Sequence, residues 1–151
     1  VLFRSEAVAG PLRQLHGMVV GTLYPWALGK HVSADLYRDL PGVIGHGGEP
    51  TVSILMALLP GALDATATAR RGYLKEEGPV AVVSPTKARF DGFEVGLYNA
   101  PERVLPGGAH GDWTVGSAER GALILERMVG YAARYVPEFR RYGQRLDAGR
   151  R

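Results

Sequence analysis

Short apolar runs along the chain predict strands. Residues 18–23 are apolar and rich in β-branched side chains, and Gly17 and Pro25 bound them, which is typical of a buried strand. Residues 80–83 have the same character and predict a second strand, and residues 92–97 are a third candidate. Strands that alternate with helices indicate an α/β layer fold.

Apolar residues recur at helical spacing before, between and after these runs. Residues 7–16 are mildly helical, and residues 34–40 predict a short helix with Ser33 as its N-cap. Residues 50–59 predict an amphipathic helix, because apolar side chains recur every three or four positions and Pro50 suits the first helical position.

The longest predicted helix covers residues 117–139. Ser117 is a suitable N-cap, and Glu119 lies in the first turn, where a carboxylate is favourable. Its expected buried stripe consists of Ala118, Ala122, Leu125, Met128, Val129, Ala132 and Val136.

Composition narrows the class of protein. The 151 residues are 46% hydrophobic and 22% charged, which favours one folded domain. No apolar run approaches the ~20 residues of a membrane span, and Cys is absent, so we expect a cytoplasmic protein with no membrane contact and no disulfide bonds. The residues after Val1 show no signal-peptide pattern and look like the start of a fragment.

The basic pI of about 9.4 comes from one end of the chain. From Arg134 onward there are six Arg and two acidic residues, whereas the preceding residues hold twelve basic and thirteen acidic ones. We therefore expect residues 140–151 to form a basic tail at a helix end. Because the excess of basic residues is confined to this end and the preceding residues are nearly neutral, we do not expect nucleic-acid binding as the main function.

A glycine-rich turn, Gly45–Glu49, leads directly into the helix predicted at residues 50–59. His46 and Glu49, three residues apart, can face one small volume, either as an acid/base pair or as metal ligands. The alternative is a tight turn in which Glu49 stabilises the helix N-terminus and His46 is simply exposed. No Gly-Lys-Ser/Thr follows the turn, so a phosphate-binding P-loop is excluded.

Two segments resemble the C-terminal half of the creatininase (creatinine amidohydrolase) family. The first is Gly45–Glu49 followed by residues 53–64, since in that family a Gly-His-Ala/Gly-Gly-Glu turn opens a helix. The second is residues 111–113 with residues 118–121 and the helix after them. The resemblance covers about residues 18–139. It implies a three-layer α/β/α creatininase-like fold, of which residues 1–139 would be a partial, C-terminal portion of one domain.

The resemblance also implies a metal-dependent hydrolase of non-peptide C–N amide bonds, and a homo-oligomer. The substrate would be a small cyclic or linear amide, and the cofactor a divalent metal ion (Zn, Mn or Fe). In such a site His46 would be the proton donor or oxyanion stabiliser, and Glu49 a carboxylate facing the metal centre. Gly47, Gly48 and Ser53 would contact the substrate.

The chain also departs from the family pattern. Thr51 replaces a frequent second carboxylate, and Trp113 replaces a frequent Pro after Gly-Asp. The family's main metal ligands lie in an N-terminal half, in Glu-x-His, Asp and Asn-Gly-His segments that this chain lacks. We therefore expect no complete metal site in these residues, and no activity from them alone.

Aromatic and polar residues outside the turn are weaker candidates for the site. Trp26 follows the first predicted strand, where α/β pockets open, so it is expected to line the substrate site; ordinary packing is the alternative. Asp112 is expected to be a cap or turn residue rather than a site residue, and His110 to be a surface loop residue rather than a site residue. Two other functions remain open: a non-catalytic assembly or regulatory partner, and a flavodoxin-like nucleotide-binding half, which the bulky residues 24–26 disfavour.

Overall fold

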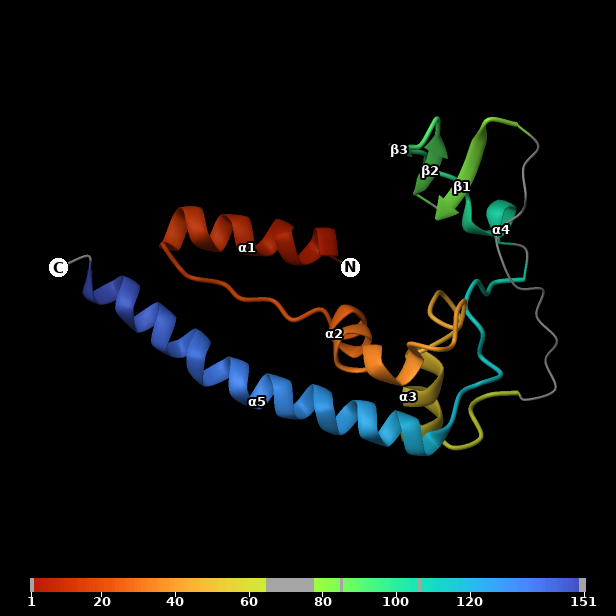
Figure 1. Cartoon of the computed structure of the whole chain (residues 1–151). Helices are drawn as coiled ribbons and strands as arrows, with labels where there is room; N and C mark the ends of the chain where they lie inside the picture. Colours follow the sequence, from red (N-terminus) through yellow and green to blue (C-terminus); the bar gives the residue numbers. More distant parts are fainter. Residues whose placement is uncertain (1, 65–77, 85, 106, 150–151) are drawn as a thin grey trace.

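A computed structural model describes residues 2–64, 78–84, 86–105 and 107–149 (Figure 1). Helices and a small sheet make up the described residues. In chain order the elements are α1 (Leu2–His16), α2 (Pro25–Val32), the 3₁₀ helix η1 (Ala34–Tyr37), α3 (Thr51–Leu58), β1 (Val80–Ser84), β2 (Lys87–Phe90), β3 (Phe93–Gly96), α4 (Pro101–Val104) and α5 (Ala118–Ala148).

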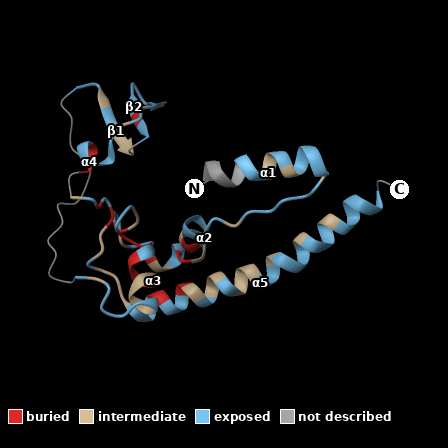
Figure 2. Ribbon diagram, turned by 180° about the vertical axis from the view of Figure 1, so that it is seen from behind, coloured by how far each residue is buried: buried red, intermediate tan, exposed pale blue. Residues whose placement is uncertain are grey.

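The core lies where α2, η1 and α3 pack against the first turns of α5, as the buried residues in Figure 2 show. Its centre is Ile124, which is completely buried, together with Tyr37 and Val43. Apolar side chains that are partly buried surround this centre: Val32, Leu36, Leu40, Ile44, Ile54, Val115 and Met128. The loop before α3 and the loop before α5 therefore meet beside the core.

The sequence correctly predicts the start of α5 but not its end or its buried face. The Ser117 side chain accepts a hydrogen bond from the Arg120 amide at 3.1 Å, as expected of an N-cap. The helix continues to Ala148, so most of the predicted basic tail is helical. Within the described ranges, neither α5 nor any other helix is apolar enough over its length to cross a bilayer.

The predicted stripe on α5 is wrong in part. Ala118 and Ala122 are exposed, and Val129 and Val136 are 67% and 60% exposed, whereas Gly121 and Ile124 are buried and Met128 packs against the core. The physical reason is that α3 and α2 contact only one face of α5. Apolar side chains on the rest of the helix therefore stay exposed.

The sheet is an antiparallel meander in the order β1–β2–β3. Asp91 and Gly92 both have positive φ, 47° and 78°, and connect β2 to β3 as a two-residue hairpin. The sequence predicts β1 and β3 but not β2, although an Asp-Gly pair is itself a hairpin signal. The described residues thus combine helices with one small sheet, and the three-layer arrangement stays a prediction.

The strand predicted at residues 18–23 is wrong. The backbone there leaves α1 and runs to α2 without regular structure, and Met18, Val19 and Val20 are 50%, 38% and 39% exposed. A strand requires a neighbour for its backbone hydrogen bonds, and β1–β3 lie apart from this segment (Figure 1). Residues 18–23 therefore have the sequence pattern of a strand, but no described strand pairs with them.

Two helices after this segment also differ from expectation. Pro25 begins α2, a helix that the sequence does not predict; the proline occupies the first helical position, where its fixed φ suits a helix, instead of only ending a strand. The helix expected at residues 34–40 is the shorter η1. Ser33 does not cap it, since its hydroxyl donates to the Gly29 carbonyl at 2.6 Å.

Candidate functional site

The Gly45–Glu49 turn is closed by its own backbone. The Glu49 amide donates to the Val43 carbonyl at 2.9 Å, and the Gly48 amide donates to the Gly45 carbonyl at 3.1 Å. Gly47 has φ of +69°, a left-handed conformation that favours glycine. A Cβ on Gly48 would lie 2.5 Å from the Val43 carbonyl oxygen, so this glycine allows a close backbone approach.

A second glycine-rich loop, residues 107–112, lies directly against this turn. The His46 carbonyl accepts hydrogen bonds from the amides of His110, at 2.7 Å, and Gly111, at 3.0 Å. A Cβ on Gly111 would be 2.9 Å from the Gly48 Cα. The two motifs that the sequence analysis treated as separate are thus in contact, and their backbones hold His46 while its side chain is exposed.

The weaker candidates in the second loop have structural partners. Asp112 Oδ1 accepts hydrogen bonds from the Thr114 amide at 2.8 Å and from the Thr114 hydroxyl at 2.6 Å, as expected of a turn residue. The His110 ring lies against the turn, since a Cβ on Gly45 would meet its Nδ1 at 2.6 Å. His46 and His110 therefore lie on two loops whose backbones are hydrogen-bonded to each other.

Glu49 points into the protein. Its side chain is completely buried, and both carboxylate oxygens accept hydrogen bonds from hydroxyls. Tyr37 donates to Oε2, and Ser53 donates to Oε1 at 2.8 Å. A buried carboxylate requires such partners, because burying it without hydrogen bonds costs several kcal/mol. In this geometry Glu49 faces the hydroxyls of η1 and α3 inside the protein.

Tyr37 is the residue of this site that sequence reasoning missed. Burial raises the pKa of its phenol well above the usual range, and the hydrogen bond to Glu49 and the negative charge of that carboxylate raise it further. The Arg120 guanidinium lies over the Tyr37 ring, 5.4 Å from its centre. No local sequence signal marks Tyr37, because its partner is twelve residues away and its ring packs against α5.

The residues predicted to contact the substrate differ in their exposure to solvent. Gly47 is exposed, whereas Gly48 and Ser53 are buried. Besides donating to Glu49, the Ser53 hydroxyl accepts a hydrogen bond from the Ser117 amide at 3.1 Å, so it joins α3 to the start of α5. Trp26 lies on α2, 38% exposed, with the Lys30 ammonium 4.5 Å from its ring centre.

The described residues do not provide a divalent metal site by themselves. No group of three or more His, Asp or Glu side chains in the described part of the chain is arranged to hold a metal ion. Glu49, the possible ligand in this chain, already has a hydroxyl donor on each carboxylate oxygen. Its buried position does not fit a metal ion that must also contact a substrate.

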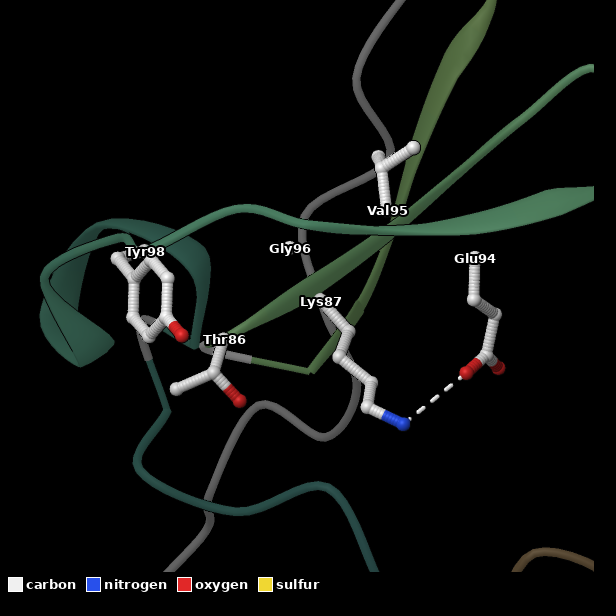
Figure 3. A pocket seen from close by; sticks show the side chains of 6 residues that line it. All are labelled: Thr86, Lys87, Glu94, Val95, Gly96 and Tyr98. Carbon is white, nitrogen blue, oxygen red and sulfur yellow. Dashed lines mark hydrogen bonds and ion pairs between the residues drawn. The ribbon is translucent and has the colours of Figure 1, made fainter.

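A cavity of about 340 Å³ lies beside the sheet (Figure 3). Its polar lining includes the Lys87 ammonium, which lies 3.1 Å from the Glu94 carboxylate. Both side chains are about half exposed. Because the two charges neutralise each other at the surface, this cavity is a weaker candidate than the surface that carries His46. Its lining consists of Thr86, Lys87, Glu94, Val95, Gly96 and Tyr98.

Comparison with known proteins gives one structural match. No family model matches the chain, and no curated protein matches it. A solved structure of a mutant creatininase, complexed with creatine, matches with a TM-score of 0.57 and 27% sequence identity. The match covers 91% of this chain and 52% of that chain, so the present chain spans about half the length of that creatininase. The described residues therefore have a creatininase-like fold with mixed helix and sheet content.

Proposed function

We propose that the chain forms part of a creatininase-like, metal-dependent amidohydrolase, which hydrolyses a non-peptide C–N bond of a small cyclic or linear amide. The observation that carries the proposal is the match to a solved creatininase over 91% of the chain. The exposed His46 on a turn fixed by backbone hydrogen bonds supports it further, because a side chain that transfers protons must reach the substrate.

His46 would act on the leaving nitrogen. In amide hydrolysis water adds to the carbonyl carbon, and the C–N bond breaks readily only when the nitrogen takes up a proton. Imidazole exchanges protons readily near neutral pH, so His46 is suited to deliver that proton. As an imidazolium it would also donate a hydrogen bond to the developing oxyanion.

A divalent ion in such an enzyme polarises the amide carbonyl and lowers the pKa of bound water. Since the described residues do not fit a metal centre of their own, the proposal places the main ligands outside this chain. The proposal gives substrate contact to His46 and an internal role to Glu49, whose carboxylate faces hydroxyls inside the fold.

The test uses the longest natural polypeptide that contains these 151 residues, with Zn²⁺ or Mn²⁺ added. Creatinine is the first substrate, because the matched creatininase binds creatine, the product of opening that lactam. We expect His46→Ala to lower turnover by about 100-fold or more. The matched control is His16→Ala, an exposed histidine at the end of α1, which should leave turnover unchanged.

Two results would contradict the proposal. Unchanged turnover in the His46→Ala variant would show that His46 is only a turn residue. Failure to hydrolyse creatinine and a panel of small cyclic and linear amides, with either metal, would refute the amidohydrolase assignment.

A non-catalytic role as an assembly or regulatory partner is the second candidate. The observation that favours it is the exposure of apolar side chains at residues 18–20, since an uncovered apolar stretch is typical of a protein contact. Light scattering coupled to size-exclusion chromatography measures the molar mass in solution. It therefore detects self-association through this segment and also tests the proposed homo-oligomer. A monomer at all concentrations would refute the oligomer.

A further inference from the structure

We propose that Tyr37 is a positioning residue for His46 and acts through the buried carboxylate of Glu49. The inference deepens the proposed function, on which its catalytic consequence rests. It starts from the carboxylate network, which consists of Tyr37, Glu49, Ser53 and Ser117. These residues come from η1, the glycine-rich turn, α3 and the N-cap of α5.

Glu49 connects the network to the turn through its own backbone. Its amide donates to the Val43 carbonyl at 2.9 Å, and its carbonyl accepts from the Gly45 amide at 3.4 Å. Glu49 thus closes the turn that carries His46. Because the side chain of the same residue is held by two hydroxyls inside the protein, the closing residue has little freedom to rotate or withdraw.

At its other end, at Ser53, the network is hydrogen-bonded to the N-cap of α5. The Ser53 hydroxyl accepts from the Ser117 amide at 3.1 Å, and Ser117 caps the helix that provides the core residue Ile124. The Arg120 guanidinium, over the Tyr37 ring, donates to the Val115 carbonyl at 2.5 Å. The Tyr37 hydroxyl is therefore held by Glu49, and the Tyr37 ring lies against Arg120, which is itself hydrogen-bonded.

Displacement of Glu49 would affect His46 through the hydrogen bonds that the His46 carbonyl oxygen accepts. That oxygen accepts hydrogen bonds from the amides of His110 and Gly111, and these bonds persist only while the turn keeps its place. Loss of the Tyr37 hydroxyl leaves a buried carboxylate oxygen without its donor, which favours displacement of Glu49 and of the turn that it closes.

Amide hydrogen exchange on the chain itself measures this coupling. In Tyr37→Phe we expect the His110 and Gly111 amides to exchange about tenfold faster or more, the loss expected for one hydrogen bond to a charged group. The Ile124 amide, in the core of α5, reports global opening and should accelerate less. The His46 imidazole signals in a ¹H–¹⁵N spectrum should shift in the same variant.

Two further variants make the test specific. Tyr98→Phe makes the same chemical change on a tyrosine that is 82% exposed, and it should leave the exchange at His110 and Gly111 unchanged. Ser53→Ala removes the other donor to Glu49, so it should accelerate the same two amides even if Tyr37→Phe folds poorly. Equal acceleration at Ile124 and in the turn, or no acceleration in the turn, would overturn the proposal.

The catalytic consequence is measured separately in the polypeptide used to test the proposed function. Tyr37→Phe should lower kcat about tenfold and leave KM within about twofold, because Tyr37 does not touch the substrate. If the turn loosens but no variant or wild type hydrolyses an amide, the proposed function fails and the coupling stands. If hydrolysis occurs and Tyr37→Phe changes neither kcat nor the exchange at His110 and Gly111, the coupling fails and the function stands.

Discussion

At Gly121 the helix α5 approaches α3 closely, and replacing this residue tests how the core holds the site. An added Cβ would lie 1.9 Å from the Ser53 carbonyl oxygen and 3.0 Å from the Ala57 side chain. The first contact is roughly 1.5 Å shorter than an ordinary van der Waals contact, which begins near 3.4 Å. Because the obstructing atom is backbone, Gly121→Ala cannot be accommodated by a rotamer change, and the two helices must move apart.

The size of the effect follows from two opposing terms. Forcing a methyl group into a packed contact costs about 1–3 kcal/mol or more. Alanine in a helix interior is more favourable than glycine by about 1 kcal/mol, which reduces the net loss. Displacement of α3 also weakens the hydrogen bond between Ser53 and the Ser117 amide and exposes part of Ile124. We expect Gly121→Ala to lower the free energy of unfolding by about 2 kcal/mol.

Urea unfolding followed by circular dichroism measures this change, and α5 provides its own control. At Gly130 the nearest atom to an added Cβ is the end of the Arg134 side chain, 3.6 Å away, so Gly130→Ala meets no obstruction. That variant should be more stable than wild type by up to about 1 kcal/mol, through helix propensity alone. If Gly121→Ala were as stable as Gly130→Ala, the close packing of α3 on α5 described above would be refuted.

Three further predictions concern caps, pH and local opening. Ser117→Ala removes the N-cap of α5 and should lower the free energy of unfolding by about 1 kcal/mol in the same assay; no change would contradict the cap. The folded state keeps the Tyr37 phenol neutral above its usual pKa of about 10, whereas the unfolded chain loses the proton there. Stability should therefore fall above about pH 10, by up to about 1.4 kcal/mol per pH unit, and Tyr37→Phe should show a flatter decline. The amides of Val19 and Val20 should exchange within seconds by mass spectrometry, and strong protection there would show a backbone partner that the described residues do not provide.

Local signals in the sequence were sufficient for several elements. The N-cap at Ser117, the Pro50 start of the helix before Pro60 and the apolar run of β1 are read from neighbouring residues, and the structure confirms their places within a few residues. The hairpin at Asp91 carries a local signal as well, the Asp-Gly pair with positive φ at both residues. These features depend on contacts within a few positions of the chain.

Features that depend on distant contacts were not predictable in the same way. His46 and Glu49 were singled out from one turn, but their opposite orientations follow from partners on η1, α3 and the second glycine-rich loop. The exposure of Val129 and Val136 likewise depends on where α2 and α3 end against α5, which periodicity alone does not contain. The sequence singles out the turn that carries both residues, whereas the direction of their side chains depends on contacts that the local pattern does not contain.

The uncovered segment at residues 18–23 has a consequence for handling the protein. It combines β-branched and apolar side chains that are largely exposed with a backbone that belongs to no strand, and it contains neither a proline nor a charge. Windows of this kind promote cross-β aggregation when nothing pairs with them, and natural proteins usually place gatekeeper residues in or beside them. Without a partner strand, the chain should tend to aggregate as its concentration rises, and a lysine at Val20 should reduce that tendency without touching the core.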